Sequence, residues 1–390
     1  MFRPTLPCAE YDAIVVGARC AGAATAMLLA RAGAKVLLID RGSHGADTLS
    51  THALMRPAVV QLHRWGLLPA IAAAGTPPVT RTTFHYGAES TPIDIEPRDG
   101  IDALYAPRRR VLDRVLVDAA AAARADIRFG MTFESVKTDG NGRVRGVHLR
   151  DRSGRSAVLR TNLVVGADGL GSTVAKQVGA RVYAQSAHRT AVLYGYFAGI
   201  ENKGYRWHYL PGATAGAIPT NDGLHCIFAS VPPDQFKSRF RASGFNGLLR
   251  LIAAADVELA NALYAAGPQD GLRRFGGVRG HLRLSHGPGW ALVGDAGYFK
   301  DPVTAHGISD ALLDAERLAA AVMRGDDRAL ADYQAERDHF ARSLFDITDA
   351  IAALDWDLDE VKHLLATLSQ CMKAELANPL SAVAPARQAA

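Results

Sequence analysis

The chain alternates short, uninterrupted apolar runs with glycine-rich turns and helical patterns, which predicts an α/β protein. Residues 13–16 form an apolar run of the kind found in a parallel strand buried on both faces. A glycine-rich turn at residues 17–22 follows, then an Ala- and Leu-rich helical stretch, Gly33, and a second apolar strand at residues 35–40. This order predicts one βαβ unit.

The turn of this unit has the composition of a dinucleotide-binding loop. Gly17 and Gly22 allow backbone amides and the positive end of a helix to approach a pyrophosphate. Asp40 ends the second strand, where a carboxylate can accept hydrogen bonds from ribose hydroxyls. Arg19 replaces the middle glycine of G-x-G-x-x-G and brings a long side chain toward the phosphate position. For these residues alone, an α/β turn that binds no nucleotide is the alternative.

Two further apolar strands also end in an acid. Residues 163–166 lead into a turn containing Asp168, although an ordinary surface turn is compatible with this stretch. Residues 290–293 lead into Asp295, and a helix is predicted from about residue 308 to 323. Ligands of open parallel sheets bind at the carboxyl ends of strands, so Asp295 is a candidate to bond a sugar-like chain. The helix would then direct its amino end toward a ring.

With these residues in this order, the chain resembles the FAD-dependent monooxygenases and reductases related to para-hydroxybenzoate hydroxylase and geranylgeranyl reductase. The resemblance covers most of the chain and is carried by three motifs: residues 17–22 with Asp40, residues 166–169 with Ser172, and residues 294–296 with Pro302 and Gly307. The chain departs from the family pattern at Ala175, Gly297, Tyr298, Ala305 and Ser309.

The resemblance implies FAD as the cofactor and NADH or NADPH as the reductant. It also implies that Asp295 contacts the ribityl chain, that Asp168 lies near FAD and nicotinamide, and that Arg109 contacts FAD. Gly307 and Ile308 would approach the pyrimidine edge of the flavin. The predicted cofactor-binding residues are Gly17, Arg19, Ala21, Gly22, Asp40, Arg41, His52, Arg109, Asp168, Asp295, Pro302, Gly307 and Ile308.

Length and composition agree with a cofactor-binding enzyme. The 390 residues suggest two or three domains, and the net charge of +5 without a long basic run argues against a nucleic-acid partner. The four cysteines, Cys8, Cys20, Cys226 and Cys371, are scattered and predict free thiols rather than a disulfide framework or a metal site. There is no leader-like start and no apolar segment of membrane-spanning length. We therefore expect a soluble cytoplasmic protein without stable membrane insertion.

The positions of the motifs predict a discontinuous Rossmann-like FAD-binding domain with an inserted, mostly antiparallel β-sheet substrate domain and C-terminal helices. The strand-like runs at residues 190–197 and 224–229, separated by Gly/Pro-rich turns, indicate the insertion. The helices are expected to pack beside the substrate domain, a membrane-surface or partner-binding role being the alternative. The predicted limits are 1–75, 99–180 and 276–339 for the FAD-binding domain, 76–98 and 181–275 for the substrate domain, and 340–390 for the helical segment.

Several polar and aromatic residues are further candidates for the site. His52 is predicted either to contact the cofactor or substrate or to make local bonds at a helix start. No catalytic residue is assigned, and His306 and Tyr298, with Lys300 nearby, are the candidates beside the third motif. Aromatic residues of the predicted substrate sheet are candidates to bound an apolar pocket, with core packing as the alternative. They are Tyr194, Tyr196, Trp207 and Tyr209.

Four functions follow from the resemblance. The first is a monooxygenase that hydroxylates an aromatic or other hydrophobic small molecule with NAD(P)H and O2 through a flavin hydroperoxide, with a separate flavin reductase as another electron source. The second is a reductase of carbon-carbon double bonds. A flavin-dependent halogenase is less favoured, because residues 206–211 do not reproduce the W-x-W-x-I-P segment of halogenases. The fourth is a non-catalytic flavin-binding protein. The sequence does not define the oligomeric state.

Overall fold

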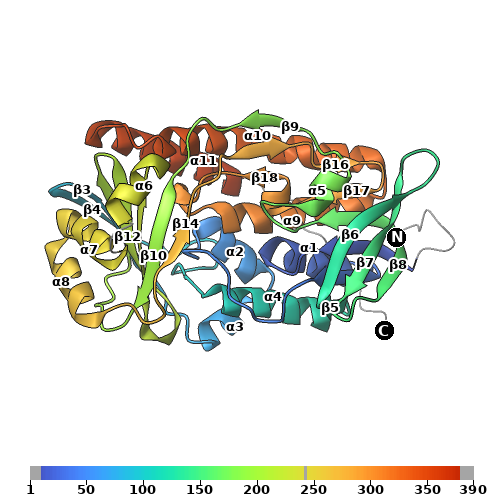
Figure 1. Ribbon diagram of the computed structural model, residues 1–390, viewed down its shortest axis with the longest axis horizontal. Helices are drawn as coiled ribbons and strands as arrows, with labels where there is room; N and C mark the ends of the chain where they lie inside the picture. The colour runs from blue at the N-terminus through green and yellow to red at the C-terminus, as the bar shows by residue number, and fades with distance from the viewer. Residues whose placement is uncertain (1–9, 241–243, 378–390) are drawn as a thin grey trace.

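The computed structural model of the chain describes residues 10–240 and 244–377. Figure 1 shows an elongated molecule in which two sheets lie toward opposite ends, with long helices running along one side. The predicted fold class, an α/β FAD-binding fold with an inserted antiparallel sheet and C-terminal helices, is confirmed. The domain limits drawn from the sequence stay a prediction.

Eight strands of the described residues form the first sheet, in the order β16-β17-β8-β1-β2-β5, with β7 added to β8 and β6 to β7. The apolar run of β1 pairs in parallel with both β2 and β8, and β17 also pairs in parallel with β8. The carboxyl ends of β1, β8 and β17 therefore meet at one edge of the sheet. The strands are β1 Tyr11–Val16, β2 Val36–Asp40, β5 Asp126–Phe129, β6 Met131–Thr138, β7 Val144–Asp151, β8 Ser156–Gly166, β16 His286–Gly287 and β17 Trp290–Leu292.

The second sheet has the order β14-β10-β13-β12-β11-β3-β4. Its pairs are antiparallel except β11 with β3, because β3 and β4 come from an earlier part of the chain and join the sheet from outside the insertion. One face is covered by α6, α7 and α8, which pack on small side chains of β12 and β13. The strands are β3 Arg81–Tyr86, β4 Glu89–Asp94, β10 Ala191–Phe197, β11 Tyr205–Leu210, β12 Ala213–Pro219, β13 His225–Val231 and β14 Arg273–Phe275.

A third, small sheet with the order β18-β15-β9 was not predicted from the sequence. Its strands are separated in the sequence: β9 precedes β10, β15 follows β14, and β18 belongs to the loop after β17. Its strands are β9 Val182–Gln185, β15 His281–Arg283 and β18 Tyr298–Phe299, and the short 3-10 turns are η1 Asn221–Gly223, η2 Gly294–Ala296 and η3 Pro302–Thr304.

Helices cover the sheets and complete the core. The first helix, α1, packs on α4 and α9, so the beginning of the chain and residues some 300 positions later share one core. The helices are α1 Cys20–Arg31, α2 Arg56–Arg64, α3 Leu68–Ala73, α4 Arg109–Ala122, α5 Thr173–Gln177, α6 Pro233–Phe240, α7 Gly244–Ala255, α8 Val257–Ala266, α9 Gly307–Arg324, α10 Asp327–Ala352 and α11 Leu358–Ala377.

The C-terminal helices differ from the prediction in one respect. The limit expected between residues 339 and 340 falls inside α10, which packs on α9 of the FAD-binding part and on α11. α11 contacts the second sheet at β11 and, through an ion pair of Lys362 with Glu89, at β4, and residues 378–390 lie outside the described part. The buried face of α10 explains the difference, because it begins at Ala329, well before residue 340.

Two expectations concern side chains and membranes. Cys20, Cys226 and Cys371 are free thiols, and Cys8 lies outside the described residues. Across residues 10–240 and 244–377, no helix combines the length and the apolar character needed to cross a bilayer.

Candidate active site

A cavity of about 700 Å³ lies where the carboxyl edge of the first sheet meets β10 and β14 of the second. Such a volume is typical of small-molecule and cofactor sites. All three glycine- and acid-containing turns reach its wall. Of the predicted cofactor-binding residues, those that line it are Gly17, Arg19, Ala21, Asp40, Arg41, His52, Arg109, Asp168, Asp295, Pro302, Gly307 and Ile308.

The first turn depends on its two glycines for close packing. Gly17 has a φ of 107°, and a Cβ added there would lie 2.4 Å from the carbonyl oxygen of Ala167. Gly22 does not line the cavity, but a Cβ on it would lie 1.8 Å from the carbonyl oxygen of Gly17. The glycines therefore allow β1, β8 and α1 to approach each other, which brings the start of α1 to the cavity.

Arg19, the departure from the glycine pattern, is held at the side of the site. Its Nη1 donates to the carbonyl oxygen of Ala46 at 2.7 Å and pairs with Asp113 Oδ2 at 3.1 Å. Asp113 also pairs with Arg109, one turn earlier on α4, at 3.0 Å. The buried carboxylate thus serves two arginines on the cavity wall. Burial alone would lower the pKa of Arg109, but the Asp113 carboxylate outweighs this effect and raises it. Two fixed cations at the start of α1 and α4 favour an anionic ligand there.

The side chains of Asp40 and Asp168 hold neighbouring turns in place through hydrogen bonds. The two Asp40 oxygens accept hydrogen bonds from the amides of Ala18, at 2.8 Å, and Gly42, at 2.6 Å. Asp168 accepts from Ser172 Oγ at 2.5 Å and from the first amides of α5. Both acids line the cavity while they hold backbone in place. Their contacts with ribose, FAD or nicotinamide stay predictions.

Asp295 is the third acid that lines the cavity. Burial raises its pKa to about 6, an effect that Arg109 only partly offsets. It stands on η2, whose first amide, that of Gly294, donates to Asp314 Oδ2 on α9 at 3.3 Å. A raised pKa indicates that the carboxylate lacks full solvation and gains from any hydroxyl that donates to it.

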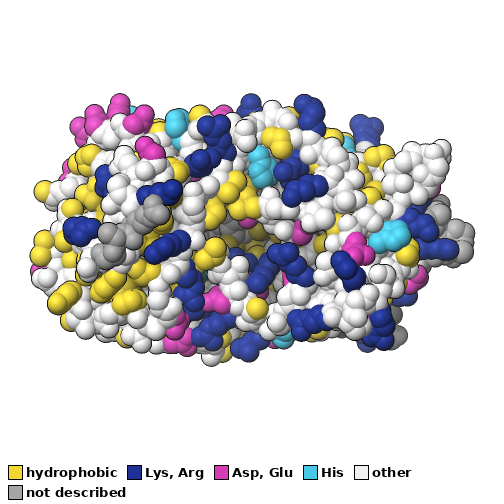
Figure 2. All heavy atoms as spheres, in the orientation of Figure 1, with side chains coloured by type: hydrophobic (Ala, Val, Ile, Leu, Met, Phe, Trp, Pro, Cys, Tyr) yellow, Lys and Arg dark blue, Asp and Glu magenta, His cyan; other side chains and the backbone are white. Residues whose placement is uncertain are grey.

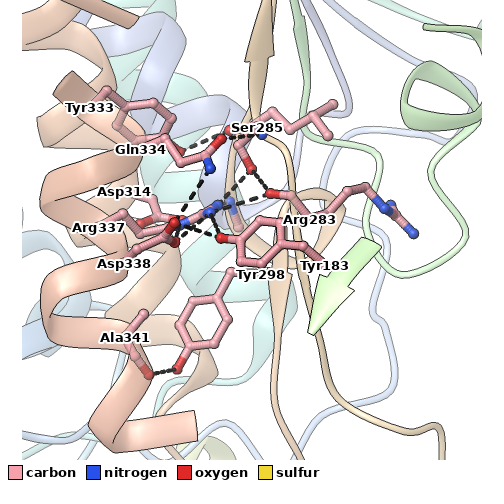
Figure 3. A network of polar contacts seen from close by, with 12 residues as sticks. Tyr183, Arg283, Ser285, Tyr298, Asp314, Tyr333, Gln334, Arg337, Asp338 and Ala341 are labelled. Carbon is pink, nitrogen blue, oxygen red and sulfur yellow. Dashed lines mark hydrogen bonds and ion pairs between the residues drawn. The ribbon is translucent and has the colours of Figure 1, made fainter. Parts of the chain in front are cut away.

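A buried arginine supports this turn from behind, as Figure 3 shows. Arg337 of α10 donates to Ser285 Oγ at 2.5 Å and to Tyr183 Oη at 3.0 Å, and it pairs with Asp338 at 2.7 Å. A Cβ on Gly297 would lie 2.4 Å from Ser285 Oγ and 3.1 Å from Arg337 Nη1. The loop after β17 is therefore clamped between α10 and the small third sheet.

The start of α9 is presented to the cavity without a cap. Within the described part of the chain, no side chain bonds the first amides of α9, and Gly307 and Ile308 line the cavity. Lys300 also lines it, although its side chain is only 2% exposed, and its Nζ pairs with Asp310 in the first turn of α9. Because Lys300 and Asp310 neutralise each other, the free amides and the helix dipole are what place positive potential at this end of the cavity.

Behind this end, a cluster of buried charged groups links α9 to α11. His306 Nε2 lies 3.4 Å from Glu375 Oε2 and 3.8 Å from Asp310 Oδ1. The three residues have the donor atoms for a metal ion, but Lys300 pairs with Asp310 and Arg317 lies 3.4 Å from Glu375. Because these two cations already neutralise the two carboxylates, the cluster is explained as an ion-pair network.

The second sheet supplies the opposite wall. Val192 and Tyr194 of β10 and Phe275 of β14 line the cavity, and the Tyr194 hydroxyl accepts a hydrogen bond from the Ser50 amide at 3.0 Å. His52 Nε2 lies 3.0 Å from the Tyr196 hydroxyl. Burial and Arg108 lower the pKa of His52 to about 3, so its imidazole is neutral at pH 7. This wall is aromatic and apolar, and the His52 beside it carries no charge at pH 7.

Comparison with known proteins identifies the family. Residues 10–229, more than half of the chain, match the family described as FAD binding domain. The chain belongs to this family. FAD-binding proteins are also among its relatives of similar length and fold.

Reductases occur among the sequence relatives. The menaquinone reductase of Mycolicibacterium smegmatis is 27% identical over 88% of this chain and 84% of its own length. Digeranylgeranylglycerophospholipid reductase 1 of Methanopyrus kandleri is 25% identical over 92% of this chain and 95% of its own. A probable electron transfer flavoprotein-quinone oxidoreductase of Escherichia coli is 30% identical, but the match spans only 47% of this chain and 42% of that protein.

Solved structures share the fold at lower identity. A probable FAD-dependent monooxygenase from Pseudomonas aeruginosa superposes with a TM-score of 0.76 at 21% identity, over 93% of this chain and 99% of its own. A flavin-dependent brominase superposes with a TM-score of 0.76 at 18% identity, over 94% and 98% of the two chains. The chain is thus an FAD-dependent oxidoreductase by family and fold.

The observed residues fit FAD. The cavity joins two helix starts without side-chain caps, α1 and α9, to Asp295 between them, a set that suits a pyrophosphate, a flavin edge and a hydroxylated linker respectively. The glycines at residues 17 and 22 permit the close backbone approach that the pyrophosphate needs. When bound, FAD would supply the redox chemistry.

Some predicted site residues lie elsewhere. Tyr298 and His306 are buried behind the cavity wall, because the Tyr298 hydroxyl donates to the Ala341 carbonyl and His306 faces Glu375. Trp207 and Tyr209 belong to the core, where Trp207 Nε1 donates to Thr82 and Tyr209 packs near Trp356. Tyr196, two residues along β10 from Tyr194, is buried and does not line the cavity. Strand alternation put these rings on the correct face, but only Tyr194 is near enough to β14 to reach the cavity.

Other lining residues had not been predicted. They share no motif. The pairing of β6 with β7 and of β10 with β14, together with the loop before α2, brings them to the cavity. Asp113, the carboxylate that pairs with Arg19 and Arg109, had not been predicted either. Its i,i+4 spacing from Arg109 is the signal that could have revealed it. The unpredicted lining residues include Thr48, Ser50, Met131, Thr132, Phe133, Val192 and Phe275.

Proposed function

We propose that the chain is an FAD-dependent monooxygenase that hydroxylates a small aromatic or hydrophobic molecule with NAD(P)H and O2. The observation that supports this most is the single cavity shared by the flavin motifs and an aromatic wall. Val192, Tyr194 and Phe275 line the same cavity as Pro302 and Ile308 of the third flavin motif. A substrate held against this wall would lie next to the flavin, as transfer of an oxygen atom requires.

The cavity would hold the cofactor and the substrate together. Asp40 and Met131 on one side and Ile308 on the other line the same volume of about 700 Å³. The substrate would occupy the part of this cavity that Val192, Tyr194 and Phe275 line, where an aromatic ring can pack on Tyr194 and Phe275.

The residues of the chain have limited tasks in such a reaction. The wall formed by Val192, Tyr194 and Phe275 orients the substrate and excludes water. The free amides at the start of α9 would stabilise negative charge on the reduced cofactor. A protein base is not required, which agrees with the neutral His52 beside the wall.

A reductase of carbon-carbon double bonds is the second candidate. It is favoured by the menaquinone reductase and the digeranylgeranylglycerophospholipid reductase, which align with more than four fifths of this chain. A halogenase is supported by fold similarity to solved flavin-dependent halogenases at 18–23% identity, a likeness that concerns the fold alone. The Trp207 region lacks the paired tryptophans of the halogenase segment, and Trp207 itself lies in the core.

The test is oxygen transfer by the purified holoprotein. NADH and NADPH oxidation and O2 consumption would be measured across phenols, indoles and polyprenyl compounds, with ¹⁸O2 as the oxygen source. We expect one of the phenols or indoles to stimulate both rates and to gain ¹⁸O. Anaerobic reoxidation of the reduced flavin by an alkene, with no ¹⁸O in any product, would instead establish the reductase.

A further inference from the structure

A group of buried charged side chains lies behind the end of the cavity where α9 begins. Lys300 lines the cavity and pairs with Asp310 Oδ2, and His306 Nε2 lies 3.8 Å from Asp310 Oδ1. The same ring nitrogen lies 3.4 Å from Glu375 Oε2, and Arg317 Nη2 lies 3.4 Å from Glu375 Oε1. One ion pair, that of Lys300 with Asp310, therefore links the His306 ring to the cavity.

The fixed charges of this group cancel, so its net charge depends on His306. Asp310 and Glu375 supply two negative charges, and Lys300 and Arg317 supply two positive charges. None of these four side chains is more than 7% exposed, so solvent and salt screen them weakly. Histidine is the side chain that most readily gains a proton near neutral pH. The group is therefore neutral with a neutral His306 and carries one positive charge with a protonated His306.

Other titratable groups lie near these charges. Burial raises the pKa of Asp295 on η2 to about 6 and that of Asp314 on α9 to about 7, and Arg337 of α10 opposes the effect at Asp314. Burial also raises the pKa of the Tyr298 hydroxyl on β18, so this ring stays neutral. Glu336, also on α10, stands at the edge of the group with 41% of its side chain exposed. Because both aspartates take up protons near neutral pH, the contribution of His306 has to be measured as a difference between variants.

The carboxylate beside His306 comes from the last long helix, α11. This helix begins next to the second sheet, where its first turn carries Asp359 and Glu360, and Figure 2 shows acidic side chains gathered on the surface at that end. Glu375, near the other end, is only 3% exposed. Burial opposes its negative charge, but the hydrogen bond with His306 and the nearby cations lower the pKa of its carboxyl. Glu375 thus stays ionised and favours a proton on His306.

The second ring nitrogen of His306 is the atom that can take up this proton. A carboxylate only accepts hydrogen bonds, so Nε2 carries the hydrogen that faces Glu375 and Nδ1 has the free lone pair. Within residues 10–240 and 244–377, Nδ1 and the nearby Ser309 Oγ are buried without a hydrogen-bond partner. Buried polar atoms of this kind usually bond ordered water, which gives a proton a route to the ring.

We propose that His306 takes up a proton when the bound flavin is reduced, and that Glu375 is the positioning residue that holds its ring and favours its charged form. NAD(P)H transfers a hydride to the flavin, which gains one negative charge, while His306 Nδ1 takes one proton from water and gains one positive charge. This charge lies behind the start of α9, whose free amides face the same end of the cavity. It favours the reduced flavin, and the proton leaves when the flavin is oxidised again. The inference requires bound FAD but holds for a hydroxylase and for a double-bond reductase alike.

The experiment measures the midpoint potential of the flavin in the FAD-loaded protein from about pH 5.5 to about pH 8.5, the range in which an imidazole titrates. Anaerobic reduction with dithionite beside a reference dye gives this potential without substrate, NAD(P)H or O2. The variants are His306→Gln, His306→Lys and Glu375→Gln. Glu336→Gln is the matched control, because Glu336 also lies beside Arg317 but is exposed and does not contact His306. The visible spectrum and far-UV circular dichroism verify that each variant holds FAD and is folded.

We expect the potentials of the wild type and His306→Gln to coincide at alkaline pH, where an imidazole is neutral. On the acid side the wild type should be higher by about 30 mV, which corresponds to a tenfold change in the equilibrium constant of a two-electron reduction. His306→Lys keeps its charge, so its potential should stay above that of the wild type at alkaline pH. The Glu375→Gln curve should run parallel to that of His306→Gln, because the ring loses the carboxylate that favours its proton. Glu336→Gln should follow the wild type.

A structural role of His306 would give a different pattern. A constant offset between the wild type and His306→Gln at every pH, identical curves, or a Glu375→Gln curve parallel to that of the wild type would overturn the proposal. So would a His306→Lys potential equal to that of the wild type at alkaline pH. Because neither substrate nor O2 is present, failure here is distinct from a failure of hydroxylation, which the ¹⁸O2 experiment reports.

Discussion

Replacement of Arg337 by methionine tests how much the clamp behind the flavin loop contributes to folding. The Arg337 side chain is 1% exposed and bonds Ser285, Tyr183 and Asp338. Methionine can fill part of the volume but leaves these oxygens without their donor. It also removes a cation close to Asp314, a buried carboxyl whose pKa burial already raises to about 7.

The expected loss can be bounded from the surroundings of each partner. Removal of one member of a buried ion pair costs about 3–5 kcal/mol. The Asp338 side chain is 28% exposed and regains some solvation, so we expect a decrease of about 3 kcal/mol in the free energy of unfolding, at the low end of that range. Arg342→Met on the same helix is the control. Arg342 is 57% exposed beside an exposed Asp346, and its removal should cost less than about 0.5 kcal/mol.

The assay is urea unfolding of the FAD-free protein, followed by FAD titration of each variant. Arg337→Met should show the lower midpoint and also weaker FAD binding, because the Gly297 loop loses its support. The reasoning would be refuted by an Arg337→Met variant that stays within about 1 kcal/mol of the wild type, or by one no less stable than Arg342→Met.

Two other predictions concern the flavin site itself. Gly17→Ala should lower the affinity for FAD by at least tenfold while α1 is retained. The reason is that the new Cβ would lie 2.4 Å from the carbonyl oxygen of Ala167, and that the φ of residue 17 is 107°. Isothermal titration with FAD measures this affinity, and an unchanged value would contradict the prediction. FAD binding should weaken by about tenfold from pH 7 to pH 5, because the free Asp295 carboxyl, with a pKa of about 6, takes up a proton below that pH and can no longer accept hydrogen bonds as a carboxylate. Asp295→Asn should flatten this pH dependence, and an equally steep profile in that variant would assign it to another group.

The sequence predicted the flavin side well because its signals are local. The apolar run of β1, the glycines after it and Asp40 lie within one βαβ unit, and their spacing alone implies the geometry that the structure has. The position of Asp295 at the cavity could be predicted for a similar reason, since an acid directly after a buried parallel strand stands at the ligand edge of the sheet, whereas its contact with the cofactor stays a prediction.

The remaining parts depend on contacts that sequence patterns do not contain. The strands of the third sheet have two to four residues, too few for a period to show. Arg337 reads as an ordinary polar residue of an amphipathic helix until tertiary structure buries it against Ser285. Among the aromatic candidates, alternation selected the face of the sheet, but distance from β14 decided that Tyr194 reaches the cavity and Trp207 does not.

The hydrogen bonds of Asp301 affect how the walls of the cavity can move relative to each other. It accepts hydrogen bonds from the amide and the hydroxyl of Thr190, at 2.6 and 2.7 Å, and from the amide of Val303, so one buried carboxyl fastens the beginning of β10 to the loop before α9. These bonds oppose separation of β10 from the loop that leads into α9. Leu49 also lines the cavity and is 53% exposed, so the segment that carries it can move while the Asp301 bonds stay intact.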